Sequence, residues 1–178
     1  MTIENRAYDR NSYILVVDDD DTLLKFFKIH LNKFFSKVLV VRSAKEAITT
    51  LKEKSIDLVL SDIRMARMDG IQLMKKVRAH DPSIPVYLVS GAMLSDEQKE
   101  IVENKADGFL KKPFSIDELH QFIDHGMKHR EIYRELFQIV QDPKKFQEMV
   151  RGDAKFKSIK DEKERARAEE LVTLLKAG

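Results

Sequence analysis

The hydrophobic pattern of the chain alternates between two spacings over its first two thirds. Short apolar runs, typical of strands buried on both faces, occupy 13–17, 38–41, 57–60, 85–89 and 108–110. Between these runs apolar residues recur every three or four positions, which predicts amphipathic helices that begin near residues 22, 43, 70, 95 and 115. Strands that alternate with helices indicate an α/β fold. We therefore predict a doubly wound, five-stranded parallel sheet followed by a helical tail.

The C-terminal part keeps the helical spacing and loses the strand-like runs. Apolar residues continue from Ile116 to Tyr133, Phe137 and Val140, interrupted by Gly126 and Arg130, which predicts one helix to about residue 141. A short helix is expected after residue 143 and a last one over 160–176. The predicted division is an N-terminal arm at 1–11, a sheet domain at 12–127 and a helical extension at 128–178.

Charge and composition exclude several classes of protein. The 178 residues carry a net charge of +2, and the 13 basic and 10 acidic residues of 128–178 are interspersed, so we expect no nucleic-acid partner. No apolar run approaches the roughly 20 residues of a membrane span, so we expect no membrane partner. The chain has no cysteine, which fits a reducing compartment, and we expect a cytoplasmic protein.

Polar side chains follow four of the predicted strands. Asp18 and Asp19 come directly after the first strand, Asp62 after the third, Ser90 after the fourth and Lys112 after the fifth. In open parallel sheets ligands bind outside the carboxyl ends of the strands, where the strand order switches. We therefore expect these side chains to converge on one site. Each also has a plainer interpretation, such as a solvated helix end or a turn, but their shared placement favours the site.

The clustered acids need a positive partner. Two carboxylates about 4 Å apart repel by roughly 4 kcal/mol at an effective dielectric near 20. Mg²⁺ with oxygen ligands satisfies such a site, and Lys112 adds a second positive charge. With the hydroxyl of Ser90 as a further donor, the group favours phosphoryl transfer through an aspartyl phosphate. Asp20, Asp21 and Lys111 are interpreted as surface charges.

Four motifs give the chain a resemblance to a known family. They are Leu-Val-Val-Asp-Asp at 15–19, Ser-Asp-Ile-Arg-Met at 61–65 with Met-Asp-Gly at 68–70, Val-Ser-Gly at 89–91 and Lys-Pro-Phe at 112–114. In this order and spacing they resemble the receiver domain of two-component response regulators, over about residues 12 to 127. The resemblance implies a flavodoxin-like (βα)5 receiver fold.

The resemblance also implies a role for each matching residue. Asp62 is the implied phosphoacceptor. Mg²⁺ is held by Asp19, Asp62 and the backbone carbonyl of Arg64, with Asp18 acting through water. The implied phosphoryl contacts are Ser90 and Lys112, the implied aromatic switch is Phe109, and the bond between Lys112 and Pro113 is cis. Two departures concern the loop after Asp62: Ala66 and Arg67 stand where the family commonly has proline, and Arg64 is long and cationic.

These observations predict a phosphorylation-dependent response regulator, a phosphoprotein of a phosphorelay rather than an enzyme in the usual sense. Its partner is a sensor histidine kinase or a phosphotransfer protein. We also expect a homodimer through residues of about 127 to 141, and exposed positions for His125 and His129. The alternatives are the N-terminal part of a longer regulator whose output domain lies beyond Gly178, a transcription regulator that acts through the tail, and a flavodoxin-like cofactor binder or small hydrolase.

Overall fold

The computed structural model describes residues 12–33, 35, 37–141, 169 and 173. Its centre is one sheet of five parallel strands in the order β2-β1-β3-β4-β5, as predicted. The strands are β1 (Tyr13–Val17), β2 (Lys37–Val41), β3 (Leu58–Asp62), β4 (Val86–Ser90) and β5 (Gly108–Lys111). The strand order switches at β1, which pairs with β2 on one side and with β3 on the other.

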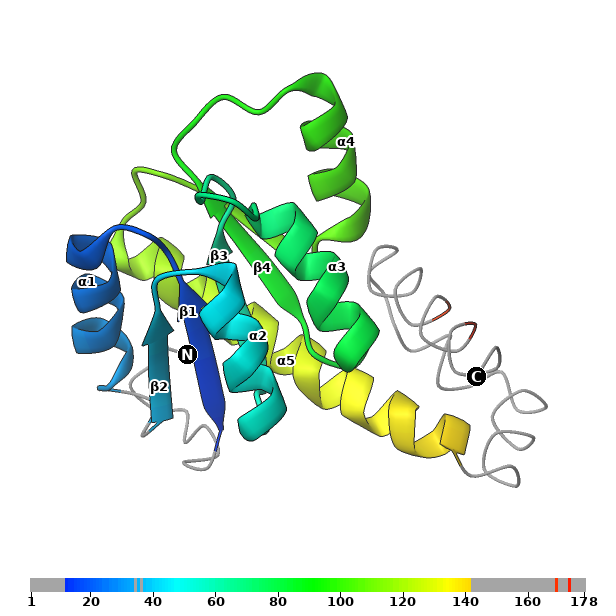
Figure 1. The fold of residues 1–178 in the computed structure, drawn as a ribbon. Helices are drawn as coiled ribbons and strands as arrows, with labels where there is room; N and C mark the ends of the chain where they lie inside the picture. Colours follow the sequence, from blue (N-terminus) through cyan, green and yellow to red (C-terminus); the bar gives the residue numbers. More distant parts are fainter. Residues whose placement is uncertain (1–11, 34, 36, 142–168, 170–172, 174–178) are drawn as a thin grey trace.

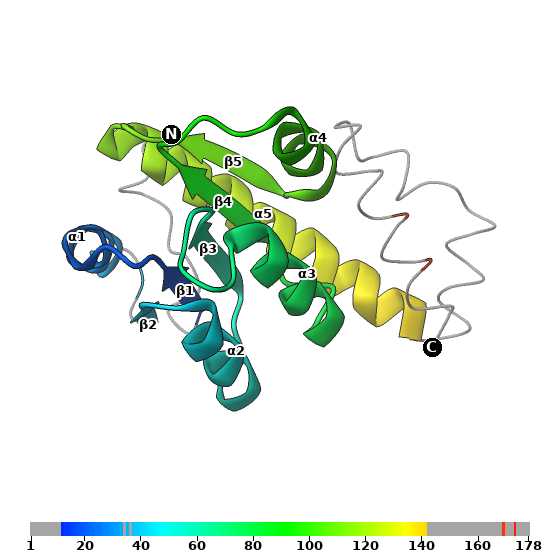
Figure 2. The same ribbon diagram turned by 45° about the horizontal axis from the view of Figure 1, so that its top comes forward.

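Helices cover both faces of this sheet (Figures 1 and 2). They are α1 (Asp21–Leu31), α2 (Ala44–Glu53), α3 (Gly70–His80), α4 (Asp96–Lys105) and α5 (Ile116–Gln141). One apolar core joins the sheet to α2, α3 and α4, and the other joins it to α1 and α5. The sheet is therefore a buried layer between two helical layers, and the predicted fold is confirmed.

Local sequence fixes where the helices begin. The side chain of Asp20 caps α1 by accepting from the backbone N–H groups of Thr22 and Leu23. Ser43 caps α2 in the same way, and α3 and α4 each begin with a reciprocal capping box. The apolar spacing from Thr22 to Phe35 predicts a first helix over those residues, and this was too long, because α1 ends at Leu31. The predicted third strand was too short, because Ser61 and Asp62 pair with β4.

The last helix crosses residues 127 and 128 without a break and stays on the sheet. Gly126 permits this contact, because a Cβ there would lie 2.7 Å from Cδ1 of Leu58. His129 is only 6% exposed, and its Nδ1 lies 2.9 Å from the hydroxyl of Tyr87. The expected surface position of His129 was therefore wrong, whereas His125 is exposed as predicted.

Beyond His129, α5 is fastened to the amino ends of three strands by a group that we call the amino-edge clamp: Asp57, Ser83, Asp107, Arg130 and Tyr133. The guanidinium of Arg130 donates to Asp57 Oδ1 at 3.3 Å and to the hydroxyl of Ser83. The hydroxyl of Tyr133 donates to Asp107 Oδ1 at 3.0 Å. Asp57 and Asp107 precede β3 and β5, and Ser83 precedes β4, so one helix ties these strands together.

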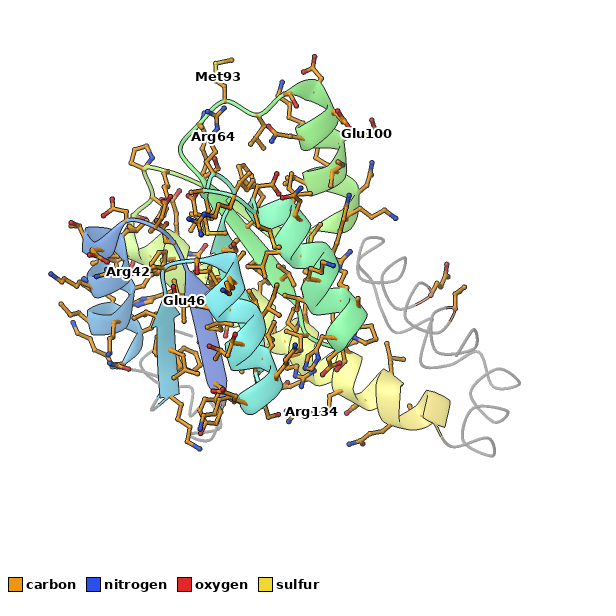
Figure 3. The ribbon with its side chains drawn as sticks, viewed as in Figure 1. Arg42, Glu46, Arg64, Met93, Glu100 and Arg134 are labelled. Atoms are coloured by element: carbon orange, nitrogen blue, oxygen red, sulfur yellow. The ribbon has the colours of Figure 1, made fainter. Side chains whose placement is uncertain are left out.

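The same two aspartates also hold strand backbone. The second oxygen of Asp57 accepts from the N–H of Tyr13 at 2.9 Å, at the start of β1. The second oxygen of Asp107 accepts from the N–H of Val86 at 2.7 Å, at the start of β4. Arg134, on the distal part of α5 in Figure 3, reaches Asp57 Oδ1 at 2.6 Å. The clamp therefore joins four strands of the sheet to α5.

The clamp changes the interpretation of the apolar stripe that we expected in a homodimer. Tyr133 is 1% exposed and packs against its own chain, so the premise that it lies beyond the receiver core was wrong. The side chains of Phe137 and Val140 and the predicted helix after residue 143 lie outside the described residues. Of the predicted final helix, Glu169 and Thr173 are described and are helical.

Candidate functional site

The carboxyl edge of the sheet gathers the predicted polar residues. Asp18 directly follows β1, and Asp62 is the last residue of β3, the strand that pairs with β1. Ser90 ends β4, which pairs with β3, and Lys112 directly follows β5. The switch in strand order thus brings four of the predicted side chains to neighbouring strand ends (Figure 1).

Lys112 joins the two buried carboxylates. Its ammonium lies 2.9 Å from Asp18 Oδ2 and 2.6 Å from Asp62 Oδ1. Both carboxylates are nearly enclosed, with Asp18 2% and Asp62 7% exposed. Such short charge-assisted hydrogen bonds fix the direction of both carboxylates. The predicted convergence of Asp18, Asp62 and Lys112 is confirmed by these distances.

The pKa values of the site reflect burial and the contacts of Lys112 with the two carboxylates. Burial raises the pKa of Asp62 above its ordinary value, and Lys112 offsets that effect only in part. Burial lowers the pKa of Lys112, but its hydrogen bonds to Asp62 and Asp18 outweigh burial, and the pKa is raised. The protonated form of Lys112 is therefore favoured, whereas the ionised form of Asp62 is disfavoured by burial.

The remaining oxygens of the acidic pair bind backbone. Asp62 Oδ2 accepts from the N–H of Arg64 at 2.6 Å, and Asp18 Oδ1 accepts from the N–H of Asp20 at 2.9 Å. Ser90 is 1% exposed, and its hydroxyl oxygen accepts from the N–H of Ala92 at 3.2 Å. These contacts hold each functional group in one direction at the mouth of the site.

Asp19 has an exposed side chain, whereas Asp18 and Asp62 are buried. Within the part of the chain that the structure describes, no three acidic, histidine or cysteine side chains are gathered as a metal-binding group. The tight acidic group therefore consists of Asp18 and Asp62, with the Lys112 ammonium between them.

Gly70 packs closely against the backbone of Asp62, a role that the sequence pattern did not indicate. Its N–H donates to the carbonyl of Ile63 at 2.9 Å, which closes the loop after β3. A Cβ at this position would lie 2.2 Å from the backbone oxygen of Asp62. Only glycine allows α3 to begin so close to the end of β3. In the same loop Arg67 has a φ of 70°, a left-handed conformation.

We expect Gly70→Ala to destabilise the protein by about 1–3 kcal/mol, because the new methyl group overlaps backbone that cannot move independently. In an unhindered helix the same change is favourable by up to about 1 kcal/mol, so a loss points to the clash. Gly91→Ala is the matched control, because a Cβ there meets only the Lys112 side chain, at 3.2 Å. Urea denaturation measures both; equal stabilities would contradict the close approach.

Phe109 and the Lys112–Pro113 bond also match the family resemblance. Phe109 is 38% exposed and lines an open groove between β5 and α5, together with Tyr87 and Phe122. The peptide bond between Lys112 and Pro113 is cis. The aromatic side chain is thus placed at the surface beside α5, one strand away from Ser90.

Comparison with known proteins agrees with this arrangement. The family model of the response regulator receiver domain matches residues 14–124. The transcriptional regulatory protein ZraR of Klebsiella oxytoca is 34% identical over 116 residues, which are 65% of this chain and 26% of that protein. The transcriptional regulatory protein GlrR of Escherichia coli (strain K12) is 32% identical over 117 residues, 66% of this chain and 26% of its own length.

Solved structures show the same fold. A CheY-like response regulator receiver domain protein from Methanospirillum hungatei JF-1 has a TM-score of 0.63 at 27% identity, covering 67% of this chain and 96% of its own. A structure described as adenylate cyclase from Rhodopirellula baltica has a TM-score of 0.67 at 25% identity, covering 74% of this chain and 98% of its own.

The chain therefore belongs to the response regulator receiver domain family, and it is a receiver of two-component signalling. It spans about a quarter of the length of the two curated relatives, ZraR and GlrR. Residues 125–141 of α5 lie beyond the matched region, and they include both α5 residues of the amino-edge clamp, Arg130 and Tyr133. No helix among the described residues has the length and apolar character needed to cross a membrane.

Proposed function

We propose that Asp62 is the phosphoacceptor of this receiver and takes its phosphoryl group from a phosphohistidine of a sensor histidine kinase or phosphotransfer protein. The observation that carries the proposal is the pairing of Asp62 Oδ1 and Asp18 Oδ2 with one ammonium, that of Lys112, at adjoining strand ends. A buried carboxylate with a fixed cation beside it is suited to receive an anionic group.

In the proposed reaction an oxygen of Asp62 attacks phosphorus. The new bond joins this oxygen to phosphorus, and the bond from phosphorus to the imidazole nitrogen of the donor breaks, with its electron pair leaving on that nitrogen. The Lys112 ammonium, 2.6 Å from Asp62 Oδ1, neutralises charge on the transferred group. The hydroxyl of Ser90 supplies a further hydrogen bond to a phosphoryl oxygen.

The residues present fit Mg²⁺. Two buried carboxylates, Asp18 and Asp62, share the single ammonium of Lys112, so the group keeps an excess negative charge that a cation can balance. Mg²⁺ commonly takes one or two carboxylates and keeps several waters, so the site does not need three gathered acids. Asp19, Asp62 and the carbonyl of Arg64 would hold the ion, with Asp18 acting through water. The ion supplies positive charge for the phosphoryl oxygens when it is bound.

We expect Asp19→Ala to weaken Mg²⁺ binding and to slow phosphoryl uptake by about tenfold or more, because it removes a ligand charge from the ion. Isothermal calorimetry with Mg²⁺ measures the first effect, and the initial rate of uptake measures the second. Asp20→Asn is unsuitable as a control, since Asp20 caps α1. Asp96→Ala on α4 removes an exposed acid that is not among the proposed ligands, and it should change neither the Mg²⁺ affinity nor the rate of uptake. Unchanged Mg²⁺ affinity in Asp19→Ala would place the ion elsewhere.

The proposed output is a change of surface. A phosphoryl group adds about −1.5 to −2 charge and three acceptor oxygens. Ser90 moves toward it, and Phe109 turns from the groove beside α5 into the space that Ser90 leaves. Two or three charge-assisted hydrogen bonds of roughly 1.5–3 kcal/mol each reach the ~5.5 kcal/mol that shifts an equilibrium from 1:99 to 99:1.

Partners beyond the phosphodonor follow from weaker observations. Relatives named as transcriptional regulatory proteins support the alternative that this receiver controls a longer regulator's output domain. Output through protein contact in the cytoplasm, with no DNA contact and no enzymatic activity beyond the receiver's own phosphoryl chemistry, stays our main proposal. Because Tyr133 is buried in its own chain, the proposed homodimer depends on Phe137 and Val140. Light scattering with and without phosphorylation tests it.

The proposed function is tested by incubating the full chain with acetyl phosphate and Mg²⁺. We expect intact mass spectrometry to show the gain of one phosphoryl group that is lost in base. An unchanged mass under conditions that phosphorylate another receiver would contradict the proposal.

A further inference from the structure

One arginine ties two loops together at the mouth of the site. The Nη2 of Arg64 donates to the backbone carbonyl of Met93 at 2.9 Å, across 29 residues of sequence. Figure 3 shows Arg64 reaching toward the loop that carries Met93, above the carboxyl edge of the sheet. The bond therefore connects the loop that follows Asp62, the last residue of β3, to the loop that follows Ser90, the last residue of β4.

The backbone of the same arginine is bound to Asp62. Its N–H lies 2.6 Å from Asp62 Oδ2, while its guanidinium extends to Met93. The Arg64 side chain is exposed, so it is free of a surrounding core that would hold it in one conformation. The flexible Arg64 side chain therefore has two alternative acceptors. One is the carbonyl of Met93, and the other is a phosphoryl group attached to Asp62.

The two acceptors differ in strength. The Met93 carbonyl is neutral, and its bond to Arg64 is exposed to solvent. Both bonds have the charged guanidinium as donor, but a phosphoryl group carries about −1.5 to −2 charge and therefore adds an attraction between opposite charges that the carbonyl lacks. The planar guanidinium also fits a phosphoryl group with two parallel hydrogen bonds. A phosphoryl group on Asp62 therefore outcompetes the carbonyl for Arg64.

Besides Arg64, the loop is held by the hydrogen bond from the N–H of Ala92 to Ser90 Oγ and by Leu94, which is partly buried against the core. Residues 91–95 lead into α4, and that helix buries one side chain, Val102. By comparison α3 buries four apolar side chains in the core on the same face of the sheet. Met93 itself is 88% exposed, so its side chain does not anchor the loop. Loss of the bond from Arg64 is therefore expected to loosen this segment first.

We propose that Arg64 is a latch: it holds the loop at 91–95 to the site in the unphosphorylated protein, and phosphorylation of Asp62 releases the loop by drawing the guanidinium away from Met93. The proposal rests on the proposed function for its trigger, but the latch itself exists without phosphorylation. It adds a second route to the surface, separate from Ser90 and Phe109, through the loop that leads into α4.

The test is backbone ¹⁵N relaxation of residues 91–95 in the full chain, with and without excess acetyl phosphate and Mg²⁺. We expect order parameters near about 0.85 in the unphosphorylated protein and below about 0.6 after phosphorylation. Arg64→Met keeps most of the side-chain length and removes the donors, so its loop should be mobile in both states. Losing one exposed hydrogen bond corresponds to roughly a two- to twelvefold shift toward the released loop.

Arg67→Met is the matched control, because Arg67 is an exposed arginine of the same loop whose removal leaves the bond to Met93 in place. It should behave as the wild type in both states. The latch is overturned if unphosphorylated Arg64→Met and wild type have equal order parameters at 91–95. The release is overturned if the wild-type loop stays rigid although mass spectrometry shows phosphorylation. Absence of any mass gain would instead overturn the proposed function, and the release with it.

Discussion

Asp62→Asn is expected to abolish phosphoryl uptake from acetyl phosphate. The amide is a poor nucleophile, and it replaces the carboxylate oxygen that lies 2.6 Å from the Lys112 ammonium. Intact mass spectrometry of wild type and variant, after identical incubation with Mg²⁺, measures the difference. Asp21→Asn makes the same chemical change in an exposed acid that pairs with Arg42, and it should be labelled like the wild type.

Loss of uptake in Asp62→Asn should not reflect unfolding. Burial raises the pKa of Asp62, so at neutral pH its ionised form costs folding free energy, and the neutral amide removes that cost. The amide also removes the contact with Asp62 that favours the Lys112 ammonium, but Asp18 still pairs with that ammonium. We expect a urea midpoint close to that of the wild type in metal-free buffer at neutral pH. Any difference should shrink as pH falls below the ordinary aspartate pKa, where the wild-type carboxyl is protonated in both states. Labelling of a folded Asp62→Asn at the wild-type rate would contradict the assignment.

Arg130→Met is expected to destabilise the protein by about 3 kcal/mol, the low end of the cost of breaking a buried ion pair. The Arg130 side chain is 8% exposed, and its loss leaves the Asp57 carboxylate, also 8% exposed, without a buried cation. Arg134 still reaches that carboxylate, which limits the loss. For a protein of this size the change lowers the melting temperature by roughly 6–12 °C.

Arg134→Met is the matched control for the amino-edge clamp. It removes a guanidinium from the same carboxylate, but this side chain is 52% exposed, and exposed pairs contribute at most about 1 kcal/mol. Thermal or urea denaturation of the two variants compares them directly. Equal small losses would mean that α5 beyond residue 128 contributes little to the stability of the receiver.

The carboxyl edge of the sheet was predictable from the sequence because the fold brings strand ends together in a fixed order. Asp18 and Asp62 follow apolar runs whose strands pair directly, and Lys112 follows the last run. Any sequence that reads as five such units must place these groups on one edge. The distances of Lys112 to both carboxylates confirm this part of the prediction.

The amino edge was not predictable in the same way. Arg130 interrupts an apolar stripe and His129 lies next to it, and polar residues in such places normally face solvent. Their partners are Tyr87 and Asp57, 42 and 73 residues away, and no local spacing reports on such pairs. A buried arginine is tolerated because Asp57 and Ser83 satisfy it. The contact of Gly70 with Asp62 was missed for a similar reason, since it depends on backbone approach rather than on side-chain pattern.

The most direct test of the central proposal identifies which residue of the wild-type chain carries the phosphoryl group. The protein is incubated with acetyl phosphate and Mg²⁺, treated with borohydride to reduce acyl phosphate, digested and sequenced by mass spectrometry. Reduction converts a phosphorylated aspartate to homoserine and leaves free aspartates unchanged. We expect homoserine at position 62 alone, dependent on acetyl phosphate. Homoserine at position 18 or 19 with unmodified Asp62 would contradict the proposal.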